Sequence, residues 1–413
     1  MNIREIFLHH ALGVTPKALK TVVSNTHIQT TGENFMKKSL IAAALLGTFA
    51  ASAFAAPSVT LYGRIDTSLA YTHLNTDKAG VDSTDTFSME SGFSTGNRWG
   101  LKGTEDIGNA KVGFVLESGF NSDDGVSGQS GRLFGREAQV NVSGAYGTLY
   151  AGRLASIASD SGSIGYLGDV SAFPNGFGIV GTQKGSTGTA YDRYDNTLAY
   201  QTPTFGGLQG AIMYSFKGDT QSDDSSIKNA RENSGDADRY LAAGLRYKAG
   251  KAAVVLTGDM TMYGNDAANY GNVDNGYSFI LGGNYDFGVA KVFAKATYFD
   301  NQVNVIDSFS LIKDARALST PQALALKGWG AELSTAVPAF GGTFLGTVGY
   351  RDAKDVDNSS YKFKRWNAAV GYSYAFSKRT NVYAAAGYAQ EKANELDRKA
   401  SAAQAGFGLV HKF

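Results

Sequence analysis

The sequence predicts an all-β protein whose antiparallel strands close into a barrel that crosses a membrane. Three observations carry this prediction. Apolar and polar residues alternate with a period of two over many stretches of about ten residues, the pattern of strands with one apolar and one wet face. The connections between these stretches are alternately short and long. Downstream of residue 55 no run approaches the ~18 apolar residues of a spanning helix, so a membrane-spanning chain must use a closed barrel.

Composition supports strands and excludes several classes of function. The 413 residues include 51 glycines, 24 phenylalanines and 22 tyrosines but only 6 prolines, which fits strands joined by glycine-rich turns. The net charge of +1 argues against a nucleic-acid binder, which would need a basic surface. Cysteine is absent, which excludes disulfides, thiol nucleophiles and cysteine-ligated metals.

The N-terminal part has the features of an export signal. Residues 36–38 form a charged start, residues 39–50 a short apolar region, and 53–55 a small-x-small cleavage site. We therefore expect a signal peptide at 36–55, cleaved near Ala55, and a barrel at 56–413. Residues 1–35 show none of these signal features, and we expect them to be an upstream extension that is absent from the mature protein.

The strands follow in order from a first strand at 59–71. A polar stretch at 72–92 is predicted to be a long loop. The further predicted strands are 97–106, 111–120, 132–143, 148–153, 196–202, 208–217, 239–248, 252–263, 276–286, 290–300, 328–337, 343–351, 364–376, 380–388 and 401–413. This gives about sixteen strands, as expected of an outer-membrane type of barrel. The long polar connections at the opposite rim from the short turns are 121–131, 217–238, 265–275, 301–326, 352–363 and 390–399.

The last predicted strand closes the ring. It ends on the aromatic residue Phe413, and a bare strand edge at this position would invite aggregation. Pairing with the strand at 59–71 removes that edge, so we expect the first and last strands to be neighbours.

The two faces of the strands differ in chemistry. Leu245, Leu281, Phe344 and Val370 belong to an apolar face with aromatic residues near its ends, as expected of a lipid-facing belt. The opposite face carries many ionised groups, which cannot share a dry core. The alternative is a soluble β-sandwich or barrel with these charges on its surface; the export signal and the terminal aromatic residue favour a wet lumen.

Nothing in the mature sequence indicates an enzyme. Its two histidines, His73 in a predicted loop and His411 on an apolar face, do not form a serine-histidine arrangement. Residues 176–181 match G-x-G-x-x-G but lack the preceding strand and the following helix. We expect no catalytic residues, no metal site and no cofactor.

Several short motifs, in order and spacing over nearly all of the mature chain, carry a resemblance to a known family. They are VTLYGR at 59–64, NRWGLKGTED at 97–106, LFGR at 133–136, GTLYAGR at 147–153, TPTFGG at 202–207 and the terminal Phe413. With these motifs the chain resembles the Gram-negative general-diffusion porins, in the beta-proteobacterial branch of the trimeric sixteen-stranded outer-membrane family.

The resemblance implies a closed sixteen-stranded transmembrane barrel with short periplasmic turns, long extracellular loops and one loop, 154–195, folded into the lumen. It implies passive diffusion of small hydrophilic solutes and ions, a homotrimer, contacts with lipid and lipopolysaccharide, and reading of Phe413 by the outer-membrane assembly machinery. The alternatives are a substrate-specific outer-membrane channel or an adhesin-like barrel, since the long loops could serve either.

In the family, acidic groups on the inserted loop face basic groups on the wall. The candidate constriction and pore-lining residues here are Arg64, Asp66, Arg98, Lys102, Glu117, Arg136, Arg153, Asp160 and Asp169. Arg64 and Arg98 fit both motif and inward parity. Arg136 and Arg153 match motifs, but simple alternation gives them the lipid-facing parity, so we expect either a bulge or a position at the rim.

Overall fold

The computed structural model describes residues 58–173, 176–181, 193–220, 229–264, 274–303, 310–312 and 324–413. All of these residues belong to one compact unit, Pro57–Phe413. The extension 1–35 and the signal peptide 36–55 predicted above lie outside the described residues.

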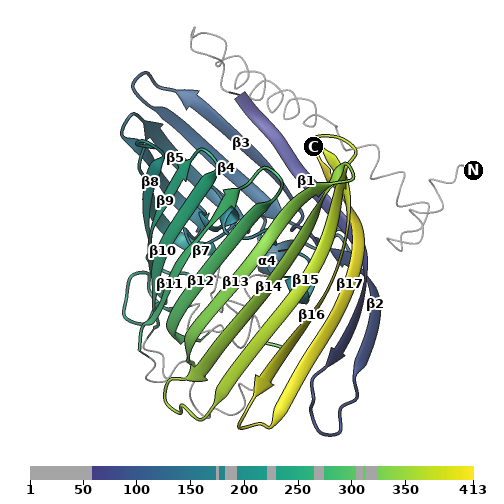
Figure 1. Ribbon diagram of the computed structural model, residues 1–413. Coiled ribbons are helices and arrows are strands. Elements are labelled where there is room, and N and C mark those ends of the chain that lie inside the picture. The colour runs from purple at the N-terminus through teal and green to yellow at the C-terminus, as the bar shows by residue number, and fades with distance from the viewer. Residues whose placement is uncertain are drawn as a thin grey trace, which may run out of the picture. The chain divides into compact units, whose positions relative to one another are not determined.

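The described residues form a closed antiparallel β-barrel of tilted strands (Figure 1). Its strands are β1 Ser58–Asn75, β2 Thr84–Ser91, β3 Arg98–Asp106, β4 Lys111–Gly119, β5 Glu137–Gly144, β6 Gly147–Ala155, β7 Arg193–Gln201, β8 Leu208–Ser215, β9 Arg239–Ala249, β10 Ala252–Met262, β11 Gly276–Asp286, β12 Lys291–Gln302, β13 Leu326–Ala339, β14 Gly342–Asp355, β15 Lys362–Ala375, β16 Thr380–Ala393 and β17 Arg398–Lys412. The short helical segments are α4 Gly128–Gly131, η2 Leu167–Asp169 and α5 Gly178–Gly181.

The ring has sixteen strand positions although seventeen strands are labelled, because β2 and β3 share one position. β2 pairs with the second half of β1, from Thr67 to Leu74, and β3 pairs with its first half, from Ser58 to Arg64. Residues 92–97 leave the wall between them. The predicted sixteen-stranded barrel is therefore confirmed, with one strand interrupted.

Closure of the ring also agrees with the prediction. β1 pairs with β17 over twelve residue pairs, from Arg64 opposite Lys412 to Asn75 opposite Ser401. The backbones of Gly63 and Phe413 exchange two hydrogen bonds of 3.1 Å. A Cβ atom at Gly63 would collide with the Phe413 ring, so the ring packs directly on a residue that has no side chain.

The two faces of the wall have the predicted chemistry. Leu245, Leu281, Phe344 and Val370 are all exposed on the outside of the barrel. Inward-facing positions carry polar side chains such as Lys295 and Arg351 and, beneath the inserted loop, apolar ones such as Ile280; all three are buried. None of the helices in the described ranges has the length and hydropathy needed to cross a membrane.

Several expected boundaries were wrong. Most of the loop predicted at 72–92 is strand, because β1 runs to Asn75 and β2 begins at Thr84. The long loops predicted at 352–363 and 390–399 are short, because β14 to β17 extend into them. At the ends of β14 to β17 the outward face is polar, so no apolar alternation marks the strand. In β2 the outward residues Phe87 and Met89 are apolar, and their alternation was missed. The strand predicted at 132–143 begins only at Glu137, because the chain forms a turn at 133–134.

Candidate functional site: an inserted loop opposite a basic wall

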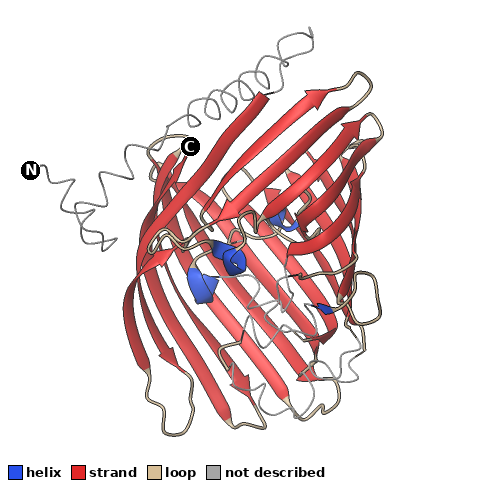
Figure 2. Ribbon diagram, turned by 180° about the vertical axis from the view of Figure 1, so that it is seen from behind, coloured by secondary structure: helices blue, strands red, loops and turns tan. Residues whose placement is uncertain are grey.

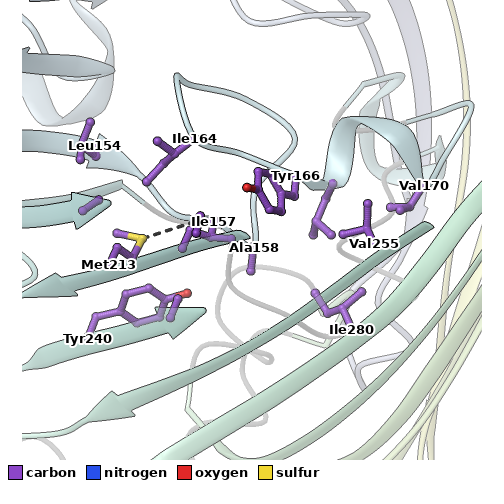
Figure 3. Packing of buried hydrophobic residues seen from close by; sticks show 14 residues of the cluster. Leu154, Ile157, Ala158, Ile164, Tyr166, Val170, Met213, Tyr240, Val255 and Ile280 are labelled. Atoms are coloured by element: carbon purple, nitrogen blue, oxygen red, sulfur yellow. Dashed lines mark hydrogen bonds between the residues drawn. The ribbon is translucent and has the colours of Figure 1, made fainter. Parts of the chain in front are cut away.

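The connection from β6 to β7 enters the barrel, and its described residues pack on the inward face of the wall. Figure 2 shows the short helical segments inside the ring of strands, and Figure 3 shows the packing. One apolar cluster joins the loop residues Leu154, Ile157, Ala158, Ile164, Tyr166, Leu167 and Val170 to the wall residues Ala199, Ala211, Met213, Tyr240, Ala242, Val255 and Ile280. The wall residues come from β7 to β11, so this part of the loop is fixed to one side of the lumen.

The loop then passes to the strands near the end of the chain. The Ser171 hydroxyl donates to the Glu332 carboxylate on β13, and the Ala172 amide donates to the Ser334 hydroxyl at 2.9 Å. Further along, the Ile179 amide donates to Gln404 Oε1 on β17 at 2.9 Å. The described parts of the loop therefore follow the wall from β7 round to β17.

The interruption between β2 and β3 receives the tip of this loop. The Phe177 amide donates to the Phe93 carbonyl at 2.5 Å, and the Phe177 ring packs against Phe93, Phe173 and Tyr383. The fully buried Asp66 holds the interrupting segment in place. Its carboxylate accepts hydrogen bonds from the amides of Ser94 at 2.9 Å and Thr95 at 2.7 Å, and from the Tyr383 hydroxyl at 2.5 Å.

A basic group lines the wall formed by β1, β3 and the chain before β5. The Glu117 carboxylate on β4 lies at its centre, 2.6 Å from Arg136 Nε and 3.8 Å from Arg98 Nη1, and accepts a 3.0 Å bond from the Tyr62 hydroxyl. Arg64 donates to the Thr95 hydroxyl at 2.8 Å. The structure thus brings together Arg64, Arg98, Glu117 and Arg136, four of the residues predicted from the sequence.

Simple alternation of the strands predicted that Arg136 and Arg153 face the lipid, and this prediction fails for both. Arg136 precedes the first residue of β5 and is buried against Glu117. Arg153 lies at a register shift in the β6–β7 ladder, where Gly152 has φ of +132° and a Cβ atom would collide with the Ala138 carbonyl oxygen. This β-bulge, one of the two expected outcomes, gives Arg153 a 2.5 Å contact with Asp195.

The remaining predicted residues lie elsewhere. Lys102 is exposed on the inward face of β3, with its ammonium group 5.2 Å from the centre of the Tyr62 ring. Asp160 is half-buried in the inserted loop. Asp169, in η2, is 2.7 Å from Lys248 Nζ on β9, so its carboxylate faces that strand and not the arginines of β1 and β3.

Glu137, a charged residue of the site, was missed by the sequence reasoning. The Glu137 carboxylate accepts bonds from the Ser163 amide at 2.8 Å and the Ser163 hydroxyl at 2.9 Å, which fixes the loop to β5. Arg193 donates to the Ser161 hydroxyl at 3.3 Å. Glu137 has the same inward parity as Gln139, a signal that could have identified it.

Within the described ranges, no group of three or more histidine, cysteine, aspartate or glutamate side chains is placed to hold an ion. The charged groups described above pair with one another across strands and with the loop. Such an arrangement can change the relative rates at which anions and cations pass through the water beside it.

Comparison with known proteins places the chain in a family. The family model described as Gram-negative porin matches residues 42–394. An outer membrane porin protein of Bordetella pertussis is 36% identical over 409 residues, covering 92% of this chain and all of the relative. Outer membrane porin protein 32 of Delftia acidovorans is 34% identical over 268 residues, covering 62% of this chain and 68% of the relative.

Solved structures show the same fold. The structure of an anion-selective porin from Comamonas acidovorans covers 86% of this chain and 100% of its own, with a TM-score of 0.58 and 24% identity. The OmpF protein of Salmonella typhi covers 86% of this chain and 97% of its own, with a TM-score of 0.54 and 16% identity. Together with the barrel and its inserted loop, the family match shows that this chain belongs to the Gram-negative porins of the outer membrane.

Proposed function

We propose that the chain forms a water-filled channel through which small hydrophilic solutes and ions diffuse passively across the outer membrane. The observation that supports this most strongly is the contrast between the two faces of the barrel: apolar side chains are exposed outside, and charged side chains line the inside. Diffusion through a hydrated lumen requires no chemical reaction. Its narrowest cross-section sets the size limit, and the charges there bias the ions that pass.

We further propose that the narrowest part lies between the inserted loop 154–195 and the basic wall group of Arg64, Arg98 and Arg136. Three guanidinium groups interact with the carboxylate of Glu117, and the carboxylate of Asp66 also interacts with Arg64. The local excess of positive charge should favour anions at this point. The relative from Comamonas acidovorans is named an anion-selective porin, which supports the same preference here.

Reversal potentials in planar bilayers test the proposed selectivity. We expect wild-type channels in a KCl gradient to favour chloride, and the double variant Arg64→Gln/Arg98→Gln to shift toward potassium. The measurement is best made near 0.1 M salt, where the Debye length is about 10 Å. Lys378→Gln, in the exposed turn between β15 and β16, is the matched control. An unchanged reversal potential in the double variant would show that these arginines do not lie at the constriction.

Liposome swelling with graded sugars separates the proposed general channel from its alternatives. Permeation that falls smoothly with sugar size supports general diffusion. Saturation by one solute would indicate a substrate-specific channel, and no swelling would indicate an adhesin-like barrel.

The partners and the processing of the chain are also proposals. We propose a homotrimer, lipopolysaccharide contacts and reading of Phe413 by the assembly machinery, which the family resemblance supports. Chemical cross-linking and assembly of a Phe413 deletion test them. Export with cleavage near Ala55 and absence of residues 1–35 are tested by N-terminal sequencing of the mature protein.

A further inference from the structure

A fully buried group of charges lies on β14, β15 and β16, away from the basic wall group. Arg351 and Arg365 face each other across β14 and β15, and Arg365 faces Glu391 across β15 and β16. The Glu391 carboxylate is 2.5 Å from Arg351 Nη2 and 3.9 Å from Arg365 Nη1. Exposure is 0% for Arg351, 2% for Arg365 and 0% for Glu391.

Burial of these three residues requires a cover, because they point into the lumen. On a bare wall of a water-filled barrel, inward-facing ionised side chains would be hydrated. Removing them from water is costly unless other groups supply their hydrogen bonds. Two segments from different loops supply these bonds here.

The first segment is the tip of the inserted loop 154–195. The Ile179 carbonyl accepts a 2.8 Å hydrogen bond from Arg365, and the Val180 carbonyl accepts a 2.9 Å hydrogen bond from Asn367 on the same strand. These contacts place α5 against β15.

The second segment comes from the connection between β12 and β13. The Ser310 hydroxyl and the Leu311 amide donate to Glu391 Oε2 at 2.9 and 2.7 Å, and the Ile312 amide donates to the Ser310 hydroxyl at 2.9 Å. Because this connection begins and ends on β12 and β13, residues 310–312 reach across the inner faces of β14 and β15 to contact β16.

An apolar cluster joins the two segments. Leu311 and Ile312 are buried with Val180 from the first segment and with wall residues from β12 to β17. The wall members of this cluster are Phe299, Leu326, Ala353, Phe363, Ala389, Ala393, Ala400 and Ala402. Many of these inward positions are alanines, which leave room for the inserted side chains.

We propose that residues 310–312 form a second pore-narrowing segment and that Glu391 is the positioning residue that holds them inside the barrel. Together with the tip of loop 154–195, these three residues close the β14–β17 side of the lumen to solutes. Solutes then pass along the side lined by Arg64, Arg98 and Arg136. The inference rests on the proposed channel function.

Cysteine labelling tests the position of the loop without any measurement of conduction, so its result is separate from that of the proposed function. The natural chain contains no cysteine, which makes single substitutions specific. In reconstituted protein, we expect Ile312→Cys to react much more slowly with a charged maleimide than Ser360→Cys, at an exposed site between β14 and β15. Equal rates would overturn the proposal.

The role of Glu391 is tested by adding a second substitution to Ile312→Cys. Glu391→Gln should accelerate labelling about tenfold or more, the factor expected for loss of a buried charge-assisted hydrogen bond. Glu395→Gln, exposed in the turn after β16, should not change the rate. Ser310→Ala removes the hydroxyl bond to Glu391, keeps the bond from the Leu311 amide and leaves the ion pairs of the wall intact. Its effect on the labelling rate decides the question if Glu391→Gln does not fold.

Conductance gives the functional readout. Ser310→Ala should raise single-channel conductance and admit larger polyethylene glycols, with Glu395→Gln unchanged. Suppose instead that Ser310→Ala folds and accelerates labelling of Ile312→Cys, but conductance and exclusion stay at wild-type values. That combination would contradict a narrowing role for this loop.

Discussion

Replacing the buried carboxylate of Asp66 tests how the inserted loop is held at the interruption between β2 and β3. The carboxylate accepts three hydrogen bonds, from the amides of Ser94 and Thr95 and from the Tyr383 hydroxyl. Asp66→Asn keeps the shape but removes the charge and presents an amide group to donors, so at least one donor loses its acceptor. A buried hydrogen bond to a charged group contributes about 1.5–3 kcal/mol, so we expect the free energy of unfolding to fall by about 2–4 kcal/mol.

Urea unfolding of the protein in lipid vesicles, followed by tryptophan fluorescence, measures this loss. Asp82→Asn, at an exposed position between β1 and β2, is the matched control and should be within about 0.5 kcal/mol of wild type. Because residues 92–97 also contact Phe177, the Asp66→Asn channel should show noisier single-channel current. If Asp66→Asn unfolds at the same urea concentration as Asp82→Asn, the carboxylate does not hold this segment.

Two further substitutions probe other anchors of the inserted loop. Gly178→Ala should weaken the docking of α5, because Gly178 has φ of +66° and a Cβ atom would collide with Gln404 Oε1; we expect a lower midpoint in urea, whereas Gly250→Ala, in an open turn, should cost less. Asp195→Asn should loosen the end of the loop at β7, because Asp195 pairs with Arg153 at 2.5 Å and with Arg132 at 3.2 Å; we expect faster proteolysis between β6 and β7 in intact vesicles, and an unchanged rate would contradict the anchoring role.

Much of the barrel could be predicted from the sequence because one physical requirement acts on nearly every strand. Positions such as Leu281 and Val370 must be apolar to face lipid, and alternate positions face water, so the period of two is strong. The strand boundaries were mispredicted mainly where outward positions are not required to be apolar. The ends of β14 to β17 have polar outward faces, so no apolar alternation is visible there. β2 was missed although its outward residues Phe87 and Met89 are apolar.

The site was predictable only in part for a different reason. Arg64 and Arg98 follow simple alternation and were correctly given the inward parity. Arg153 depends on a bulge at Gly152, which shifts the parity by one residue and leaves no mark in the hydrophobic pattern. The roles of Asp66 and Glu391 depend on contacts with residues far away in the chain, Ser94 and Ser310, and no local pattern encodes such contacts.

Accessibility of single cysteines to a charged thiol reagent, during recording from reconstituted channels, tests the orientation of the wall most directly. Lys102 lies on the inward face of β3 and Leu281 on the outward face of β11. Modification of Lys102→Cys should reduce the current at once, and Leu281→Cys should remain unmodified with its current unchanged. Rapid modification of Leu281→Cys together with an inert Lys102→Cys would contradict a barrel with lipid outside and water inside.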